Sequence, residues 1–320
     1  MTKGKEKESI LITGGAGYLG NIISRNFLDK GYRVGCLDNL MYRQDYSIAP
    51  LASNPYFEFI FGDVRDRLLL KEQVPKFDII VPLAAVVGAP ACAYRPFEAQ
   101  TVNEDAIRIL EEIRSKNQKV IFPNTNSGYG TKSGQFKCDE TTPLEPISLY
   151  GKTKCAAEDI LLKSDKGSVV YRLASVFGMS PRMRLDLSFH DMVLQALTQH
   201  AIVMSEGGFT RNYIYIGDIA KGFQYAVENY DNMVGEAFNL GLDEGNIKRT
   251  DLAHKVAMHI TGTLIYENTS KADPDKRNYL VSNEKLRKAG FEAKTSIDYG
   301  IDELKKGLSI MLKNNPNRNV

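Results

Sequence analysis

Short apolar runs alternate with longer mixed segments through the first half of the chain. Runs of about four to six mostly apolar residues predict buried strands at Ile10–Thr13, Arg33–Leu37, Phe57–Phe61, Asp78–Leu83, Val120–Phe122 and Val169–Leu173. The segments between them are long enough for helices, among them Tyr18–Lys30, Pro96–Asn117 and Ser148–Ser164. Strands and helices in alternation indicate an α/β fold, a Rossmann-type doubly wound parallel sheet with helices on both faces.

The pattern loosens after about Phe177. Residues 178–186 are rich in Gly, Pro and Arg, while a strand-like run returns at Ala237–Leu240. We therefore predict two domains. The larger covers residues 1–176 plus about 211–240. A smaller, interleaved α/β domain covers about 177–210 plus 241–320.

Composition and charge exclude several classes of protein. The 320 residues carry 41 basic and 39 acidic side chains, so a net charge of +2 gives no reason to expect nucleic acid or an anionic membrane as partner. Four scattered cysteines form no CxxC pair. The longest apolar run, 79–89, is far below the roughly 20 residues of a membrane helix, and the charged N-terminus resembles no signal peptide. A cytoplasmic enzyme is expected.

The histidines give no metal site. His190, His200, His254 and His259 show no ligand spacing with Asp, Glu or Cys, so we predict no bound metal and expect these side chains at the surface or at helix ends.

A glycine-rich turn joins the first predicted strand to the first predicted helix. Gly14 permits a tight turn, Gly17 leaves room for phosphates against the backbone, and Gly20 allows close packing of helix on strand. Backbone N–H groups at such a helix start bind a pyrophosphate. Asp38 follows Gly14 by 24 residues and ends the next strand, where a carboxylate holds the adenosine ribose. This favours NAD; Arg43 leaves NADP as a minor alternative.

Tyr150 and Lys154 predict a centre for proton transfer. Four residues apart on a helix, they lie on one face, and an ammonium beside a phenol lowers the tyrosine pKa. Tyr150 is then a general base for a sugar hydroxyl. The family resemblance described next implies a Ser or Thr four residues before Tyr129. That residue is Thr125, whose hydroxyl would bridge the substrate hydroxyl and Tyr150, with Ser127 as its rival.

These motifs together resemble the extended short-chain dehydrogenase/reductases, specifically the NAD-dependent nucleotide-sugar epimerase/dehydratase family, over nearly the whole chain. The resemblance implies that Asp63 accepts from the adenine, that Leu83, Ala84 and Ala85 form the fourth strand's motif, and that Asn103 buttresses the active-site strand. The cofactor-binding residues implied in full are Gly14, Gly17, Tyr18, Leu19, Gly20, Asp38, Asn39, Leu40, Asp63, Val64, Leu83, Ala84, Ala85, Asn103, Tyr150, Lys154 and Leu173.

The same resemblance implies a nucleotide-sugar site in the second domain. Arg211 opens a segment in which the family places an arginine on the substrate diphosphate, and a planar guanidinium suits that contact. The other substrate-binding candidates are Asn126, Ser127, Ser175, Arg182, Arg184 and Arg277.

Asn126 and Ser127 also reduce the number of reactions expected of this chain. Related 4,6-dehydratases carry Asp and Glu there, and an amide and a hydroxyl cannot replace an acid and a base near neutral pH. Several phrases, including Ser180–Asp186 and Asp273–Arg277, resemble the GDP-heptose 4-dehydrogenases of bacterial capsule biosynthesis. We therefore expect NAD-dependent oxidation at C4 of a nucleotide sugar, with a GDP-heptose favoured.

Two alternatives remain from the residues: a 4-epimerase using the same side chains, and a protein that senses NAD without turnover. The resemblance also implies a homodimer or a larger homo-oligomer, paired through the helices near Pro96–Asn117 and Ser148–Ser164.

Overall fold

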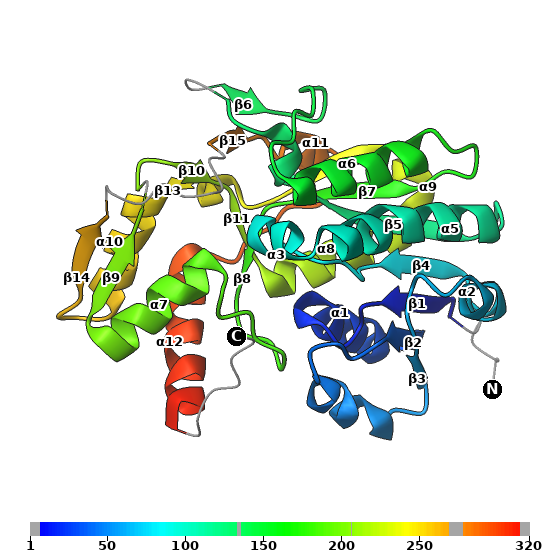
Figure 1. The fold of residues 1–320 in the computed structure, drawn as a ribbon, viewed down its shortest axis with the longest axis horizontal. Coiled ribbons are helices and arrows are strands. Elements are labelled where there is room, and N and C mark those ends of the chain that lie inside the picture. Colours follow the sequence, from blue (N-terminus) through cyan, green and yellow to red (C-terminus); the bar gives the residue numbers. More distant parts are fainter. Residues whose placement is uncertain (1–6, 133–135, 206, 269–277, 314–320) are drawn as a thin grey trace. The chain divides into compact units, whose positions relative to one another are not determined.

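The computed structural model describes residues 7–132, 136–205, 207–268 and 278–313, and its chain divides into two compact units (Figure 1). Unit 1 comprises Met1–Thr125, Ser148–Arg172 and Ala220–Phe238, and unit 2 comprises Asn126–Ile147, Leu173–Ile219 and Asn239–Val320. The division differs from the predicted boundaries mainly in two segments, 126–147 and 211–219, which both lie in unit 2, as do the few residues 173–176 and 239–240. Their short strands pair with other strands of that unit, which explains the difference.

Seven strands form one sheet in the order β12-β7-β5-β4-β1-β2-β3. They are β1 Ser9–Thr13, β2 Arg33–Asp38, β3 Phe57–Phe61, β4 Ile79–Pro82, β5 Lys119–Thr125, β7 Val169–Leu173 and β12 Ala237–Leu240. The pairs β1–β2, β1–β4, β2–β3 and β4–β5 are parallel. The chain runs outward from β1 to β3 and then returns to β4, so the strand order reverses between β1 and β4. The predicted doubly wound sheet is confirmed, and such sheets bind ligands at the strands' carboxyl ends beside the reversal.

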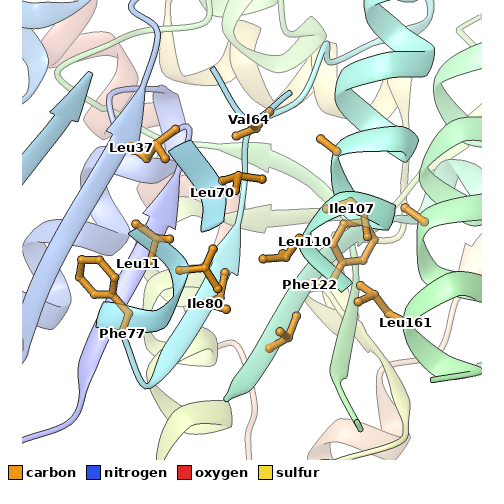
Figure 2. Packing of buried hydrophobic residues seen from close by; sticks show 14 of the residues in the cluster. Leu11, Leu37, Val64, Leu70, Phe77, Ile80, Ile107, Leu110, Phe122 and Leu161 are labelled. Carbon is orange, nitrogen blue, oxygen red and sulfur yellow. The ribbon is translucent and has the colours of Figure 1, made fainter. Parts of the chain in front are cut away.

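One face of the sheet packs against α2 (Arg67–Gln73), α5 (Ala106–Ile113) and α6 (Leu149–Leu162). Figure 2 shows the apolar cluster between them, with strand residues such as Leu11 and Ile80 beside helix residues such as Leu110 and Leu161. Successive strand side chains point to opposite faces, so a sheet covered on both sides needs nearly continuous apolar strands. This requirement explains why the strands were readable as short apolar runs.

The opposite face carries α1 (Tyr18–Asp29) and α8 (Ile216–Glu228). The rings of Tyr171 in β7 and Phe223 in α8 pack edge to face with centroids 5.5 Å apart. Asn26 of α1 donates from Nδ2 to Oε1 of Gln224 in α8 at 3.2 Å, which joins the two helices. The short helix α9 (Tyr230–Met233) follows α8.

The helix expected at Pro96–Asn117 is interrupted and shorter. It consists of α4 (Pro96–Gln100), a π-helical turn (Thr101–Asp105) and α5, which ends at Ile113, and it is preceded by α3 (Ala89–Tyr94). Hydrogen bonds from Asn103 in the π turn fix the interruption, as described below. The helix expected at Ser148–Ser164 is α6, and Ser148 caps it by accepting the Gly151 N–H at 3.1 Å.

Unit 2 consists of short paired strands and helices (Figure 1). Its strand pairs are β6 (Lys137–Cys138) with β15 (Leu280–Val281), β8 (Ser175–Phe177) with β11 (Tyr213–Tyr215), β9 (Ala201–Met204) with β14 (Leu264–Glu267), and β10 (Thr210–Arg211) with β13 (Ile247–Lys248). Its helices are α7 (Ser188–Gln199), α10 (Arg249–His259), α11 (Glu284–Lys288) and α12 (Ile297–Lys313). The ring of Phe189 lies 4.7 Å from that of Phe177 and 5.6 Å from that of Tyr213, which gives this unit an aromatic core.

Candidate active site

The glycine turn lies between the end of β1 and the start of α1. Gly14 has φ of +69°, and a Cβ there would lie 2.7 Å from the backbone nitrogen of Ala84, so no other residue fits. At Gly20 a Cβ would come within 2.3 Å of the Gly14 carbonyl, which shows how closely the helix packs on the turn. At Gly17 a Cβ would meet only that carbonyl, at 3.0 Å. No side chain caps α1 at Gly17. The first N–H groups of α1 therefore fit a pyrophosphate, with Tyr18 and Leu19 in the first turn.

Asp38 is buried at the carboxyl end of β2, beside the glycine turn. Its Oδ2 accepts the Ala16 N–H at 3.0 Å, and its Oδ1 accepts the Leu40 N–H at 2.8 Å and the Gln44 side-chain amide at 3.2 Å. Leu40 holds an unusual φ of +52°. The placement fits a carboxylate that receives a ribose. Gln44 is a residue of this loop that the sequence did not reveal.

Asp63, the carboxylate expected to bind the adenine, is held by a neighbour that the sequence does not reveal. Arg65 binds Asp63 with two hydrogen bonds, at 2.8 and 2.7 Å, and the Asn39 amide donates to the same carboxylate at 3.0 Å. The hydrogen bonds from Arg65 outweigh burial and lower the pKa of Asp63 to about 2. Asp63 is therefore ionised at neutral pH and can accept a hydrogen bond from an amino group. Val64 beside it is buried.

The π turn places Asn103 against the loop after β4. Its Oδ1 accepts the Val86 N–H at 2.8 Å, and its Nδ2 donates to the Val86 carbonyl at 3.0 Å and to the Thr153 hydroxyl at 3.2 Å. Thr153 lies on α6 between Tyr150 and Lys154. Asn103 thus ties the segment after Leu83, Ala84 and Ala85 to the helix that carries the predicted base.

Tyr150 and Lys154 lie on successive turns of α6. Tyr150 packs against the buried cluster Val86, Cys92 and Ala99. The Lys154 side chain is buried, and its Nζ lies 3.9 Å from the centre of the Phe122 ring in β5. Burial lowers the pKa of Lys154 to about 7. Its ammonium is therefore close to its titration midpoint at neutral pH, so nearby negative charge controls how much of it is protonated.

Thr125 is the buried last residue of β5. Asn126 and Ser127 follow it in a short 3-10 helix, Asn126–Tyr129, and are also buried. Among the described residues, neither polar atom of the Asn126 side chain has a hydrogen-bond partner. Buried amides are almost always paired, so this one is suited to a ligand.

Unit 2 carries the predicted substrate arginines. Arg211 in β10 is buried and its guanidinium lies 5.8 Å from the Phe209 ring, while Arg182 is buried in the loop before α7. Arg184 is held by Asp186 through bonds of 2.7 and 2.5 Å. Ser175 opens β8 just after Leu173, the last residue of β7. Arg277 lies outside the described residues.

The expectation that His190 lies at the surface is wrong. The side chain is fully buried, its Nε2 accepts the Gly178 N–H at 3.1 Å, and its Nδ1 donates to the Arg184 carbonyl at 2.7 Å. Burial lowers the pKa of His190 to about 4. A neutral His190 therefore holds both ends of the loop that carries Arg182 and Arg184.

The sequence profile of the NAD dependent epimerase/dehydratase family matches residues 10–241. This chain is a member of that family. The matched segment runs from β1 through β12 and includes the glycine turn, Asp38, the Tyr150–Lys154 pair and Arg211.

Named relatives of this epimerase/dehydratase family member handle UDP-sugars. It is 32% identical to the uncharacterized UDP-glucose epimerase YtcB of Bacillus subtilis, over 72% of this chain and 76% of the relative. It is 27% identical to UDP-glucuronic acid decarboxylase 1 of Arabidopsis thaliana, over 94% of this chain and 70% of the relative. The crystal structure of UDP-glucuronic acid 4-epimerase from Bacillus cereus, in complex with UDP-glucuronic acid and NAD, superposes with a TM-score of 0.83 at 26% identity and covers 95% of this chain and 99% of that one.

Membership confirms the predicted fold class and NAD as the cofactor. It also shows an enzyme of the NAD-dependent epimerase/dehydratase family, without deciding between the predicted dehydrogenase and the alternative epimerase. Over residues 7–132, 136–205, 207–268 and 278–313, no helix has the length and apolar character needed to cross a membrane. Within those same ranges, no three His, Cys, Asp or Glu side chains gather into a metal-binding group.

Proposed function

We propose that this chain is an NAD-dependent nucleotide-sugar 4-epimerase whose substrate is a UDP-sugar. The observation that carries the proposal is the pairing of Tyr150 with a buried Lys154 on one face of α6, after a strand that ends in Thr125. The choice of epimerisation and of UDP rests on the relatives, since a UDP-glucose epimerase and a UDP-glucuronic acid 4-epimerase are both similar to this chain.

The chain's own residues supply proton transfer. Tyr150 takes the proton of the C4 hydroxyl, the Lys154 ammonium stabilises the phenolate, and the Thr125 hydroxyl relays between substrate and Tyr150. NAD, when bound, supplies a hydride acceptor for the C4 carbon. Epimerisation needs Tyr150 to return its proton to the same oxygen after the keto sugar has rotated to present its other face. One base therefore serves both directions.

Asn126 and Ser127 support this choice over dehydration. A 4,6-dehydratase withdraws one proton and donates another at C5 and C6, and neither an amide nor a serine hydroxyl does so readily near neutral pH. Both residues are buried, and the unpaired Asn126 amide suits a hydrogen bond to a sugar hydroxyl. Net oxidation of a GDP-heptose is the second candidate, carried by the resemblance of Ser180–Asp186 and Asp273–Arg277 to those dehydrogenases.

One experiment separates these reactions. Purified protein with NAD is incubated with UDP-glucose, UDP-glucuronic acid and a GDP-heptose, and the products are read by mass spectrometry and proton NMR. A C4 epimer of unchanged mass from a UDP-sugar supports the proposal. Loss of two hydrogens supports the dehydrogenase instead, and loss of water shows that the roles assigned to Asn126 and Ser127 are wrong.

The cofactor site has its own test. Gly17→Val places a side chain where the pyrophosphate is expected, while inside the protein its Cβ meets only the Gly14 carbonyl. We expect loss of bound NAD from a folded protein, measured by cofactor content and circular dichroism. The comparison variant Gly20→Val meets backbone atoms of Gly14 and Gly15 within 2.6 Å, so it should unfold the turn itself. Unchanged NAD content in Gly17→Val would remove the assignment.

A further inference from the structure

A third polar side chain shares the helix face of Tyr150 and Lys154. Glu158 lies one turn beyond Lys154 on α6, so the three residues follow at intervals of four. Side chains on a helix lean toward its N-terminus, which directs the Glu158 carboxylate back toward Lys154. Glu158 is buried, so its charge acts in a medium of low dielectric constant.

Two strands meet the Glu158 carboxylate. Arg172 of β7 binds Oε1 through Nη2 at 2.6 Å and through Nε at 3.1 Å, and both side chains are almost fully buried. The side-chain amide of Asn124 in β5 donates to Oε2. The helix is thereby fixed to β5, which ends at Thr125, and to β7. We call Glu158, Arg172 and Asn124 the subjacent triad.

The charges around Lys154 do not balance. On α6 the titratable neighbours are Tyr150, Cys155 and Glu158; β7 contributes Arg172; β5 contributes only the Phe122 ring and the Asn124 amide. Burial raises the pKa of the Cys155 thiol to about 12, so it carries no charge at neutral pH. Among the described groups named here, the two buried cations Lys154 and Arg172 therefore face one buried anion, Glu158, which binds Arg172 directly.

We infer that Glu158 is a positioning residue for Lys154: its buried carboxylate, bound to the guanidinium of Arg172 and one helical turn from the ammonium without contacting it, sets by its field the fraction of Lys154 that is protonated in the working pH range. Arg172 acts in the opposite direction by competing for the same carboxylate. Neither side chain needs to touch the substrate.

The balance of charges leaves room for such control. Burial lowers the pKa of Lys154, and the neighbouring Cys155 and Glu158 both act in the opposite direction. The result is a midpoint of about 7, where a small change of field changes the protonated fraction most. The thiol is neutral at this pH, so Glu158 is the charged group of the two. A carboxylate within about 4–6 Å typically moves a pKa by about 1–3 pH units. Loss of the Glu158 charge should therefore leave Lys154 largely neutral at pH 7, and a neutral amine no longer stabilises a Tyr150 phenolate.

The test measures the lysine directly. The full chain is labelled with ¹³C,¹⁵N-lysine, and the Lys154 side-chain resonance is assigned from its loss in Lys154→Met and titrated with and without NAD. We expect Glu158→Gln to lower the Lys154 midpoint by about 1 pH unit or more, and Arg172→Met to raise it. Opposite shifts from the two halves of one ion pair are a result that a purely structural crosslink does not produce.

Controls keep the result interpretable. Glu111→Gln removes another carboxylate of unit 1, partly buried and paired with the buried Arg114, and should leave the Lys154 midpoint unchanged. If either single variant fails to fold, the double variant Glu158→Gln/Arg172→Met is used, because it removes both charges and leaves neither buried without a partner. The Lys154 midpoint of the double variant should still lie below that of the wild type. An unchanged midpoint in the folded variants overturns the inference.

The inference rests on the proposed role of Lys154 but is read without a sugar substrate. Shifted titrations together with no turnover of any nucleotide sugar would reject the proposed function and keep the inference. Where turnover is found, Glu158→Gln should lower kcat at neutral pH with little change in KM and should move the pH profile. The same variants without an altered pH profile or titration show that the subjacent triad is structural only.

Discussion

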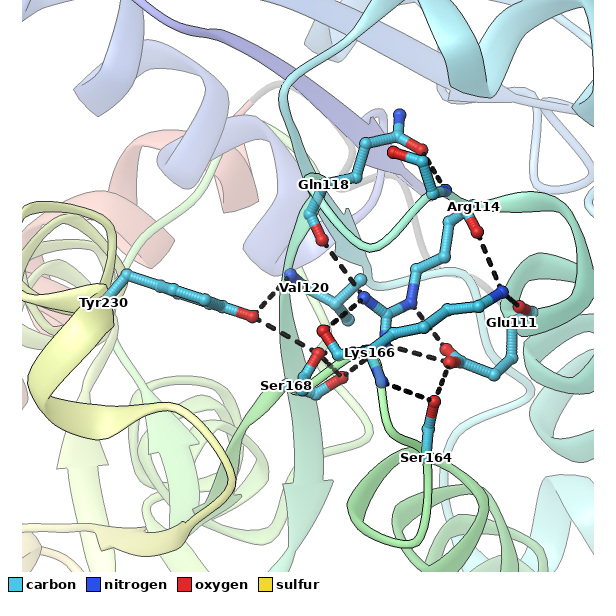
Figure 3. A network of polar contacts seen from close by, with 10 residues as sticks. Glu111, Arg114, Gln118, Val120, Ser164, Lys166, Ser168 and Tyr230 are labelled. Atoms are coloured by element: carbon cyan, nitrogen blue, oxygen red, sulfur yellow. Dashed lines mark hydrogen bonds and ion pairs between the residues drawn. The ribbon is translucent and has the colours of Figure 1, made fainter.

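Unit 1 contains two Glu–Arg pairs, each with a buried arginine, that have the same chemistry in different surroundings. Glu158 and Arg172 lie beneath the proposed catalytic lysine. Glu111 and Arg114 lie at the end of α5, where Arg114 binds the carboxylate at 2.6 and 3.0 Å and also donates to the carbonyls of Gln118 and Gly167 (Figure 3). Arg114 is fully buried, as Arg172 nearly is.

The two pairs differ in the groups that surround them. In Figure 3 the remaining partners of Glu111 and Arg114 are backbone carbonyls, the hydroxyls of Ser164 and Ser168, and Lys166, which donates to the Arg114 carbonyl at 2.8 Å. These contacts give hydrogen bonds to backbone carbonyls at the end of α5 and after α6, and they join the two segments. Glu158 instead has the titrating Lys154 one turn away. A buried ion pair is thus a crosslink or an electrostatic control depending on its neighbours.

The largest effect on turnover is expected from a change of Tyr150, two helical turns before Glu158 on α6. Tyr150→Phe removes the proposed base and leaves the ring packed against Val86 and Cys92. Turnover should fall by about 10²–10⁴, the usual range for general acid–base catalysis, with substrate binding little changed. Steady-state kinetics with the substrate found in the product assay measures it. Near-normal turnover would place the base elsewhere.

The second effect concerns stability alone. Arg114→Met leaves the partly buried Glu111 without its counterion and removes the donor to the carbonyls of Gln118, Lys166 and Gly167, so the free energy of unfolding should fall by about 3–5 kcal/mol. The matched control on the same helix is Arg108→Met, whose partner Glu104 lies at 3.1 Å while Arg108 itself is exposed, and which should cost less than about 1 kcal/mol. Urea denaturation measures both.

Arg114→Met also tests the comparison itself. Its Lys154 titration midpoint should match that of wild type, whereas the triad variants shift it. A shifted midpoint in Arg114→Met would mean that general loosening of unit 1, and not the local charge, moves Lys154.

The smallest expected effect is a change of stability with pH, and it comes from His190, which is buried in its neutral form. The folded-state pKa of His190, about 4, lies below its ordinary value of about 6.5, so the folded state resists protonation. Its contribution to stability is present above pH 6.5 and is lost as the pH falls toward 4. Between pH 7 and pH 5 this loss amounts to about 2 kcal/mol. Urea denaturation at both pH values should show that loss reduced in His190→Gln.

Features that rest on local chain chemistry could be predicted from the sequence. Strands such as Ser9–Thr13 and Val169–Leu173 could be predicted because a sheet covered on both faces needs apolar runs, and Gly14 because only glycine suits its turn. The Tyr150–Lys154 pair follows from helical spacing alone. The expected homodimer stays a prediction.

Features that rest on contacts between distant segments could not be predicted. The π turn at Thr101–Asp105 exists because Asn103 reaches Val86 and Thr153, and nothing in the spacing of apolar residues marks it. The partnership of Glu158 with Arg172, and the burial of His190, likewise depend on which strands and loops meet. Isolated charged or titratable residues in a sequence look the same whether exposed or buried.

Asp38 carries a consequence for redesign. The carboxylate expected to select the cofactor also accepts hydrogen bonds from the Ala16 N–H, the Leu40 N–H and the Gln44 side-chain amide. It therefore also fixes the conformation of the loop around the expected ribose site. A replacement intended to admit the phosphate of NADP deletes those acceptors at the same time. If Asp38 selects the cofactor as proposed, a conversion to NADP has to rebuild the segment 38–44 together with it.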